Sequence, residues 1–406
     1  MLSVATTAMP VEAAGRQNPP MPEAQKFNTH VCLVSAQATP NLLPLLDDRW
    51  RPLKVVLATS DAMTSQSGAL AALLRTKGVK VETLPLRDAY DYSSLCDDFL
   101  GFLAASADES MALNVTGGTK LMAVAAQEVF RANQRAAFYV NIENDEIVFL
   151  GGGHSSPLQA KLKIAEFLRA HGYTTQGGDP PQVSAKQRDL AARLVDHVSA
   201  AGRALGQINS LAQQARPSLK CRLTEDQLDS RALADMLGLF TDAGYLTQAN
   251  GSVTFPDESS RAFVNGGWLE LHLLHVLNDL RGAHAGITDI ALNLQVVHPD
   301  GRTKNELDVA FMYRNTLHII ECKTANLAQP GVTQDDKATE AIYRMESLLK
   351  LGGLRTRGMI VDYRGAFAAS EANRKRAQLA RLEILSAGEL RDAKGQLARR
   401  WIAARA

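Results

Sequence analysis

The chain has 406 residues, of which 46% are hydrophobic and 21% are charged, and its formal net charge is +1. This composition is typical of a globular protein, and the length exceeds what one ordinary core accommodates, so two or three domains are expected. The small net charge excludes a polycation. Any contact with nucleic acid must therefore come from a local basic patch, such as Arg374–Arg376 or the pair Arg355 and Arg357.

The N-terminal residues and the apolar runs bear on location. Residues 1–28 lack the charged start and long apolar stretch of a secretion signal, and their Pro, Ala and Gln content predicts a loosely ordered arm. No apolar run reaches the roughly 18–20 residues that cross a bilayer. We therefore expect a cytoplasmic protein with no membrane partner. Buried, reduced thiols are expected for the cysteines, which are Cys32, Cys96, Cys221 and Cys322.

Short apolar runs alternate with helical patterns in the first part of the chain. This alternation predicts a parallel, doubly wound sheet over residues 29–175. The expected strands are His30–Ala36, Lys54–Ser60, Val79–Leu86, Met111–Thr116, Ala136–Ile142 and Glu146–Leu150. The expected helices include Gln66–Lys77, Lys120–Ala132 and Leu158–His171.

A glycine-containing loop joins the fourth of these strands to the next helix. Gly117 and Gly118 allow a ligand to approach the backbone closely, the free N–H groups of the helix N-terminus favour anions, and Lys120 adds a positive charge. The loop therefore predicts a phosphate-bearing ligand at the C-terminal edge of the sheet, with a purely structural tight turn as the alternative. Its spacing matches neither a Walker A loop nor G-x-G-x-x-G.

Small polar residues follow the first two strands and are expected at the same edge. The predicted ligand-binding residues are Ser35, Gln37, Thr39, Ser60, Asp61, Met63, Thr116, Gly117, Gly118, Thr119 and Lys120.

The middle of the chain is mostly helical. After a break at Gly177–Pro181, helices are expected over Lys186–Ala201, Leu205–Ala215 and Thr224–Ala243. Asn250-Gly251 then gives a strong hairpin signal. Three helices followed by a small hairpin predict a winged-helix-like unit over residues 182–258. Such a unit binds nucleic acid in some proteins and is a spacer or dimer element in others.

The last part of the chain, residues 262–406, predicts an α/β unit around a mixed sheet. The expected helices are Trp268–Arg281, Gln334–Leu351 and Ala387–Ala403. The expected strands are Ile287–His298, Leu307–Tyr313, Leu317–Thr324, Gly358–Tyr363 and Leu382–Ser386.

Two of these strands carry charged residues on one face. Side chains alternate along a strand, so Glu306 and Asp308 share a face of the first, and Glu321 and Lys323 share a face of the second. Because Ile319–Ile320 directly precedes Glu321, the second strand is expected to be largely buried. A solvated Glu–Lys pair is the less favoured alternative. Glu306 either assists the site or is a charge at its rim.

The register of the two strands decides whether the carboxylates meet. If Tyr313 pairs with Leu317, Asp308 lies about opposite Glu321 and Cys322. Directly paired residues have Cβ atoms about 4.5–5.5 Å apart, so two carboxylates there can share a hard cation such as Mg²⁺ or Mn²⁺. Such an ion polarises a phosphodiester and lowers the pKa of a water, and a neighbouring lysine offsets developing phosphate charge.

Asp308 followed by Glu321-Cys322-Lys323 resembles the D…E-X-K core of the PD-(D/E)XK nuclease superfamily, although Leu307 stands where the motif has proline. That superfamily also uses a glutamate from a preceding helix, which here implies Glu270 after Gly266-Gly267-Trp268; an exposed first-turn glutamate is the alternative. The resemblance implies the catalytic residues Glu270, Asp308, Glu321 and Lys323. It implies metal ligation by Glu270, Asp308, Glu321 and the backbone carbonyl of Cys322.

The first domain resembles a CARF domain, the cyclic-oligoadenylate sensor of type III CRISPR systems, and Thr116–Lys120 carries most of that resemblance. The order of sensor, winged helix and nuclease resembles the CARF-fused ancillary nucleases of the Can and Card type, over about residues 30–406. This implies a homodimer that binds a cyclic adenylate, with cyclic tetra-adenylate expected, across its two Rossmann-like sensor domains. It also implies ligand-activated cleavage of DNA in antiviral defence, with RNA left open as a second substrate.

Two other functions fit the same order of domains. A CARF-type transcription regulator would bind DNA through the winged helix and carry an inactive nuclease domain, but the intact residues Glu270, Asp308, Glu321 and Lys323 argue against it. A restriction or repair nuclease with another regulatory ligand would cut without a cyclic nucleotide.

Overall fold

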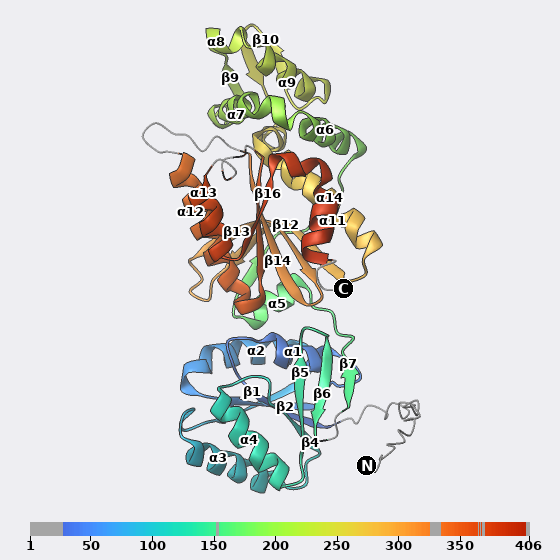
Figure 1. Ribbon diagram of the computed structural model, residues 1–406, viewed down its shortest axis with the longest axis vertical. Coiled ribbons are helices and arrows are strands. Elements are labelled where there is room, and N and C mark those ends of the chain that lie inside the picture. The colour runs from blue at the N-terminus through green and yellow to red at the C-terminus, as the bar shows by residue number, and fades with distance from the viewer. Residues whose placement is uncertain are drawn as a thin grey trace, which may run out of the picture.

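The computed structural model describes residues 27–151, 154–324, 334–363, 365, 367 and 370–402, without the side chains of 198–203 and 334–337. The arm expected over residues 1–28 lies outside these residues except for Phe27 and Asn28. Three units follow one another along the long axis (Figure 1). The N-terminal unit is at one end, the C-terminal α/β unit is in the middle, and the unit from the middle of the sequence is at the other end. No described helix is both long and apolar enough to cross a bilayer.

The N-terminal unit contains the predicted parallel sheet. Its strand order is β3-β2-β1-β4-β5-β6-β7, in which the first five strands are parallel and β6 and β7 are antiparallel to their neighbours. The strands are β1 Thr29–Leu33, β2 Lys54–Thr59, β3 Lys80–Pro85, β4 Met111–Asn114, β5 Ala136–Asn141, β6 Glu146–Leu150 and β7 Ser155–Pro157. The doubly wound architecture is therefore confirmed.

Helices cover both faces of this sheet (Figure 1). The helices are α1 Thr39–Leu46, the short η1 Asp61–Met63, α2 Thr64–Thr76, α3 Tyr92–Ala105 and α4 Lys120–Ala132. Helices α1 and α2 pack in one hydrophobic cluster, and α3 and α4 pack in another. Helix α4 has the predicted bounds, whereas the predicted helix Leu158–His171 is shorter and forms α5, Ile164–Ala170.

The middle unit consists of helices and a small antiparallel sheet with the order β10-β11-β9. Its elements are α6 Ala185–Asp196, α7 Val198–Gln214, β9 Lys220–Arg222, α8 Glu225–Leu228, α9 Arg231–Asp242, β10 Thr247–Ala249 and β11 Ser252–Thr254. The hairpin predicted at Asn250-Gly251 is confirmed. The predicted single helix Thr224–Ala243 is wrong, because Ser230 accepts a hydrogen bond from the Leu233 N–H and starts a new helix. The winged-helix assignment stays a prediction.

The C-terminal unit is built on a mixed sheet with the order β16-β15-β14-β13-β12-β8. The strands are β8 Thr174–Gln176, β12 Ile287–Val297, β13 Lys304–Tyr313, β14 Thr316–Lys323, β15 Arg357–Asp362 and β16 Leu382–Ser386. The chain thus adds an edge strand to this sheet before it enters the middle unit.

Helices pack on both faces of the mixed sheet. They are α10 Glu258–Ala262, the π-helical turn η2 Phe263–Gly267, α11 Trp268–Ala283, α12 Gln334–Leu349, η3 Lys350–Arg355 and α13 Glu371–Leu379. The segment predicted as the helix Ala387–Ala403 is helical over its described residues, but it is not one regular α-helix. It consists of the 3₁₀ helix η4 Ala387–Asp392, the α-helix α14 Ala393–Leu397 and the π-helical η5 Ala398–Ile402.

A two-residue turn joins β13 to β14. Arg314 and Asn315 both have left-handed backbone conformations, with φ of 45° and 54°, which match the twist of a tight hairpin. Tyr313 therefore pairs with Thr316, and the predicted pairing of Tyr313 with Leu317 is wrong by one residue.

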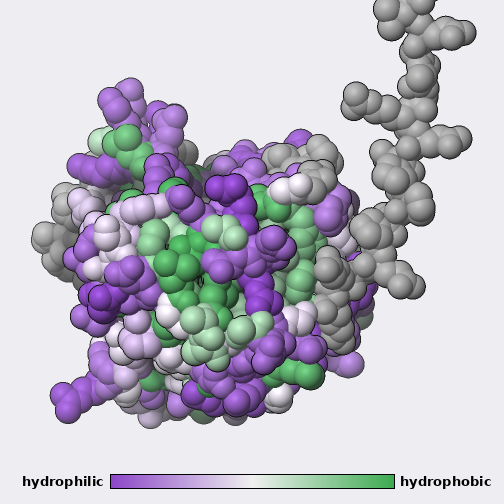
Figure 2. Space-filling view, turned by 90° about the horizontal axis from the view of Figure 1, so that it is seen from below, coloured by the Kyte–Doolittle hydropathy of each residue, from purple (hydrophilic) through white to green (hydrophobic). Residues whose placement is uncertain are grey.

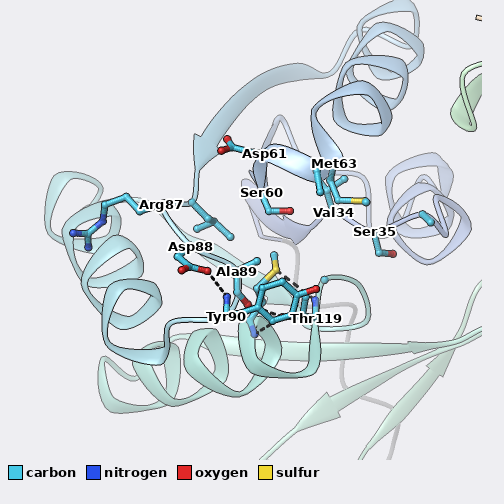
Figure 3. Close-up of a pocket in the computed structure, with 15 residues that line it drawn as sticks. Val34, Ser35, Ser60, Asp61, Met63, Arg87, Asp88, Ala89, Tyr90 and Thr119 are labelled. Atoms are coloured by element: carbon cyan, nitrogen blue, oxygen red, sulfur yellow. Dashed lines mark hydrogen bonds between the residues drawn. The ribbon is translucent and has the colours of Figure 1, made fainter.

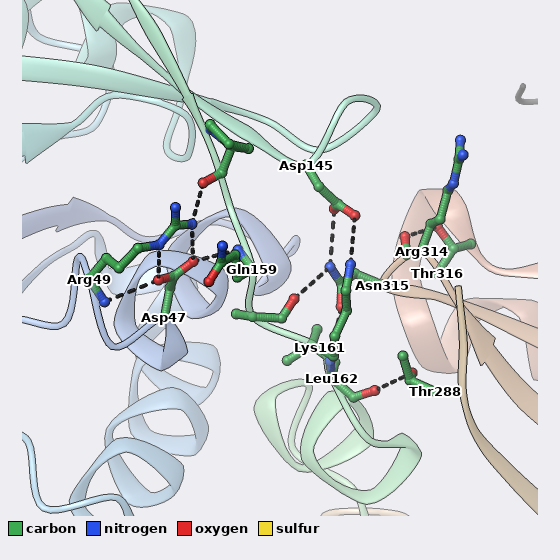
Figure 4. Close-up of polar contacts among 12 residues, drawn as sticks. Asp47, Arg49, Asp145, Gln159, Lys161, Leu162, Thr288, Arg314, Asn315 and Thr316 are labelled. Carbon is green, nitrogen blue, oxygen red and sulfur yellow. Dashed lines mark hydrogen bonds and ion pairs between the residues drawn. The ribbon is translucent and has the colours of Figure 1, made fainter. Parts of the chain in front are cut away.

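The tip of this hairpin is buried against the N-terminal unit (Figure 4). Asn315 is 2% exposed, and its amide nitrogen donates to Asp145 Oδ1 at 3.0 Å and to the Ala160 carbonyl at 3.1 Å. Its amide oxygen accepts from the Leu162 N–H at 2.9 Å. Because Asp145 lies in the β5–β6 turn, one side chain fastens β13–β14 to the N-terminal sheet.

A shared hydrophobic core strengthens this junction. One cluster runs from α1 and α2 of the N-terminal unit to β13, β14 and α12 of the C-terminal unit, and it includes Leu42, Leu70, Met312, Ile319 and Met345. Because apolar burial is continuous across the junction, the two units pack as one body rather than as beads on a linker.

All four cysteines are free thiols. Cys32 and Cys221 are buried, as predicted, whereas Cys96 and Cys322 are half-buried. Burial raises the pKa of the Cys32 thiol to about 12.

Candidate functional site

The corrected register brings the two strand carboxylates together. Val309 pairs with Ile320, so the next position sets Asp308 directly opposite Glu321. Asp308 Oδ2 also accepts the Cys322 N–H at 2.8 Å, which ties β13 to β14 at this point. Glu321 is fully buried and Asp308 is 9% exposed. The sequence therefore predicted the right pair of carboxylates from a register that was one residue off.

Glu321 is held by two cations. Its Oε1 accepts from Lys323 Nζ at 2.5 Å and pairs with an Arg344 guanidinium nitrogen at 2.7 Å. Its Oε2 is buried and has no hydrogen-bond partner among the described residues. Arg344 also donates to the Glu306 carbonyl at 3.2 Å, so it bridges β13 and β14 from helix α12. Sequence reasoning missed Arg344, because its helix follows the motif at no fixed spacing.

The segment Gly266–Trp268 sets the position of helix α11 beside this cluster. Gly266 has φ of 126°, and a Cβ there would lie 2.3 Å from Thr324 Oγ1, so only glycine lets η2 pass the end of β14. Trp268 is fully buried, with its ring edge-on to that of Tyr363 at 5.2 Å. These contacts fix the first turn of α11, on which Glu270 lies.

Burial and neighbouring charge perturb Glu270 and Asp308. Burial and the negative charge of Asp308 raise the pKa of Glu270 to about 7, although a hydrogen bond with Asn293 opposes the rise. Burial and the charge of Glu321 raise the pKa of Asp308 to about 6. Like charges this close disfavour simultaneous ionisation, as in other paired carboxylates.

Strand β12 is distorted beside these groups. Asn293 has φ of 50°, and the position opposite Asp308 drops out of the β12–β13 ladder. Leu292 and Leu294, two residues apart, consequently pack in different hydrophobic clusters. A regular strand would send both to one face. The irregular residue turns its amide toward Glu270, and distortions of this kind are frequent next to active sites.

The cluster suits a divalent cation. No group of three or more His, Cys, Asp or Glu side chains is arranged as a ready-made metal site among the residues that the structure describes. Yet the unpartnered Oε2 of Glu321 and two carboxyls with raised pKa values are a site that a hard cation would satisfy. Ligation by Glu270, Asp308, Glu321 and the Cys322 carbonyl stays a prediction.

The N-terminal unit contains a cavity of about 350 Å³ at the carboxyl ends of its parallel strands (Figure 3). The predicted ligand residues on its wall are Ser35, Ser60, Asp61, Met63, Gly118 and Thr119. The predicted residues Gln37, Thr39, Thr116, Gly117 and Lys120 are not on this wall. The segment Leu86–Tyr90 is, and the sequence could have indicated it because it follows the end of β3 just as the other loops follow β1 and β2.

Two of the residues outside the wall shape the glycine loop instead. Thr116 Oγ1 donates to Asn114 Oδ1 at 2.7 Å and accepts the Val140 N–H at 2.7 Å, which fastens the loop to β5. At Gly117 a Cβ would lie 2.0 Å from the Leu33 carbonyl oxygen. Thr119 then caps α4 by accepting the Met122 N–H at 3.1 Å. The tight turn is therefore structural, and it also presents Gly118 and Thr119 to the cavity.

The domains that contain the two sites each match a known protein family. Residues 29–167 match the family described as the Card1 CARF domain, and residues 257–404 match the family described as Card1-like, endonuclease domain. The chain is similar to the structure of protein VC1899 from Vibrio cholerae, with 27% identity, a TM-score of 0.83 and coverage of 93% of this chain and 98% of that chain.

Two further structures share the fold. Can2 from Sulfobacillus thermosulfidooxidans, solved in complex with cyclic tetra-adenylate, is 24% identical with a TM-score of 0.74, and the match covers 91% of this chain and 97% of that chain. A type III CRISPR defence DNA nuclease activated by cyclic oligoadenylate is 20% identical with a TM-score of 0.53, over 83% of this chain and 45% of that chain. No curated protein sequence matches the chain.

The close approach at Gly117 can be tested by adding one methyl group. We expect Gly117→Ala to lower the free energy of unfolding by about 2–3 kcal/mol, because the new Cβ meets a backbone oxygen. Gly101→Ala, on helix α3, is the matched control, because a Cβ there would meet nothing within 4 Å. Since alanine favours a helix more than glycine does, this change should raise the free energy of unfolding by up to about 1 kcal/mol. Urea denaturation measures both, and equal effects would contradict the packing described here.

The carboxylate cluster predicts a pH dependence of stability in EDTA. Both raised pKa values exceed those of an unfolded chain, about 4, so between about pH 4 and pH 7 the folded protein binds more protons. Stability from these groups therefore falls as pH rises through that window. Asp308→Asn and Glu270→Gln should each exceed the wild type by about 1–2 kcal/mol at pH 8 and match it near pH 4 in urea denaturation. If the wild type instead became more stable relative to these variants as the pH rises, the raised pKa values of Glu270 and Asp308 would be refuted.

Proposed function

The chain belongs to the Card1-type proteins, in which a CARF domain, here residues 29–167, precedes an endonuclease domain, here residues 257–404, and we propose that it is an endonuclease switched on by a cyclic oligoadenylate. The observation that carries the nuclease half is the buried Glu321, which faces Asp308 across the hairpin and has an unpartnered Oε2. The activator we propose is cyclic tetra-adenylate, because Can2, which shares the fold, is solved with that ligand. An antiviral nuclease of this kind would act in the cytoplasm on DNA, with RNA as a second substrate.

The chain's own residues divide the work at the nuclease site. Glu270, Asp308 and Glu321 would hold Mg²⁺ or Mn²⁺, which when bound polarises the phosphodiester and lowers the pKa of a water. Lys323 is 22% exposed and touches Glu321, so its ammonium lies where it can orient that water or offset charge on the phosphate. Arg344, whose side chain is 43% exposed, presents its remaining N–H groups beside the same carboxylate, where they suit a substrate phosphate.

The sensor cavity favours a ligand shared by two chains. Its volume of about 350 Å³ accommodates part of a four-nucleotide ring, not the whole. Arg87 is the one cationic residue on its described wall, and it is bonded to Asp98 at 2.6 Å, while Asp61 and Asp88 are acidic. The negative charge of four phosphates would be poorly compensated by the single cationic residue on the described wall of one cavity. A homodimer that places the ring between two cavities doubles the number of donors.

An apolar surface on the N-terminal unit supports the dimer. Figure 2 looks onto that end of the molecule and shows a group of hydrophobic residues with a hydrophilic rim. On helices α3 and α4, which pack together, Leu100 is 47% exposed and Val124 is 56% exposed. Exposed apolar patches with a polar rim mark interaction sites, and a second copy of the CARF domain is the occupant we propose.

Binding at the sensor can reach the nuclease through the contacts of strand β5. Thr116 of the glycine loop holds the Val140 N–H of β5, and β5 leads into the turn that carries Asp145. Asp145 in turn accepts from Asn315 at the tip of the β13–β14 hairpin. A displacement of the ligand loop would therefore act on the strands that present Asp308 and the E-X-K segment.

The function is tested by nicking of supercoiled plasmid. Purified protein with Mn²⁺ and cyclic tetra-adenylate should nick the plasmid, and omission of the nucleotide should lower the rate at least about tenfold. Lys323→Ala should lower cutting by about 10²–10³-fold, because it removes the ammonium beside the phosphate. Nucleotide affinity should stay unchanged, because Lys323 does not lie on the wall of the sensor cavity. Lys394→Ala, which removes a lysine at the surface of the same domain, is the matched control.

Two results would decide against this function. Plasmid that stays intact with metal and nucleotide would contradict the nuclease proposal. Cutting at the same rate without the nucleotide would favour a restriction or repair enzyme instead.

The Asn315 contact predicts a separable defect. Asp145→Ala removes the link between the β5–β6 turn and the hairpin, so nucleotide affinity should stay within about twofold while activation of cutting falls about 5- to 50-fold. Asn144→Ala, an exposed neighbour in the same turn, should leave both unchanged. Isothermal titration and the nicking assay measure the two quantities. A parallel loss of affinity, or unchanged activation, would show that the signal takes another route.

A further inference from the structure

A cavity of about 480 Å³ lies where the middle unit meets the endonuclease domain. The middle unit contributes Gln187 of α6 and Tyr245, which precedes β10. The endonuclease domain contributes the η2 turn, the start of α11 and the distorted part of β12 and β13. The cavity is separate from the sensor, and it depends on residues from both units.

The cavity opens directly beside the nuclease site. Glu270 and Glu306 lie on its wall, together with Asn293, which bonds to Glu270. A nucleotide whose phosphate sits at the carboxylate cluster therefore has this cavity within reach of its own or a neighbouring base.

The charge of the wall excludes phosphate as the natural occupant. No Lys, Arg or His is found among the described residues that line the cavity, and its charged members are the carboxylates of Glu270 and Glu306. A second phosphate there would meet negative charge without compensation, whereas a neutral group would not.

The remaining wall suits a flat, neutral ring with polar edges. The rings of Tyr245 and Phe263 stack with centroids 4.1 Å apart and an angle of 17°, which gives the cavity an aromatic side. The amide of Asn265 supplies both a donor and an acceptor, as the edges of nucleobases require. Gln187 adds N–H donors, since its Oε1 already accepts from Ser184. Aromatic stacking combined with neutral amide groups is how proteins hold unpaired bases.

We propose that this cavity is a nucleobase subsite for an unpaired nucleotide next to the cleaved phosphodiester. The proposal rests on the proposed nuclease function and extends it to the place where one base of the substrate is held. A base in a duplex is paired and stacked, so it can enter a walled cavity only after it leaves the helix. The subsite therefore takes one unpaired base of the substrate beside Tyr245.

Abasic nucleotides test the subsite on the wild-type protein. The probe is a single-stranded DNA oligonucleotide with one main cleavage position, in which one abasic nucleotide is moved along the sequence. At one position relative to the cleaved bond, loss of the base should lower kcat/KM by about 5- to 100-fold, the range that stacking of one base provides. At positions farther away the effect should be within about twofold. Equal effects at all positions would overturn the proposal.

Variants at Tyr245 connect the effect to the cavity. Tyr245→Ala should cut the intact and the abasic oligonucleotide at nearly equal rates, whereas Tyr245→Phe, which keeps the ring, should retain the difference. Tyr139→Ala removes a half-exposed tyrosine from the sensor sheet and is the matched control. A full abasic effect in Tyr245→Ala would also overturn the proposal.

A binding readout separates this proposal from the function on which it rests. An all-abasic oligonucleotide should bind the wild type at least about fivefold more weakly than the intact one in fluorescence anisotropy with Ca²⁺, and the ratio should approach one in Tyr245→Ala. If the wild type cuts but ignores missing bases, only the subsite is refuted. If it does not cut, the affinity ratio still decides whether the cavity takes a base.

Discussion

The two-residue turn at Arg314 and Asn315 is the constraint on which the rest of the structure depends. Its left-handed residues fix the pairing of β13 with β14, and that pairing alone decides that Asp308 faces Glu321. A shift by one residue would send one of the two carboxylates to the other face of the sheet. The same turn carries the side chain that bonds to Asp145, so the geometry of the nuclease strands and their attachment to the sensor have one origin.

This arrangement places carboxylate groups in the protein interior, where a charge without a partner is unfavourable. Glu321 lies fully buried between layers of aliphatic side chains, and it is tolerated because Lys323 and Arg344 both reach its Oε1. Asp308 and Glu270 form no ion pair with any residue that the structure describes, and their pKa values are raised. Local rules are commonly broken at functional sites, and the surrounding core maintains the strain. Here that core is the hydrophobic cluster that continues into the sensor.

Much of this could be read from the sequence, because it depends on local pattern. Alternation along β13 and β14 identified the charged faces, whereas Glu270 was implied by the resemblance to the PD-(D/E)XK superfamily. What failed depends on geometry that the pattern does not encode. Arg-Asn lacks the Asn-Gly signature of a tight turn, so the register was off by one. Arg344 reaches the site from a helix whose position only the folded sheet determines.

The sensor illustrates the same limit. The end of β3 was as visible as the ends of β1 and β2, yet Leu86–Tyr90 was not included among the ligand loops. Conversely, Thr116 and Gly117 belong to the motif but serve the turn, since one bonds to β5 and the other lies against a carbonyl. A motif thus identifies the loop, and the packing around each residue decides which atoms face the ligand.

Burial also links the ion, the proton and the fold at the nuclease site. A carboxyl with a raised pKa is partly protonated near neutral pH, so a cation that binds it must displace a proton, and its affinity rises with pH. A bound cation would in turn remove the repulsion between these carboxylates. The hairpin that aligns these groups is fixed at its tip by Asn315, far from the reacting atoms along the strands. A displacement of that tip would alter the spacing of the carboxylates, and the affinity for a small hard cation depends on that spacing.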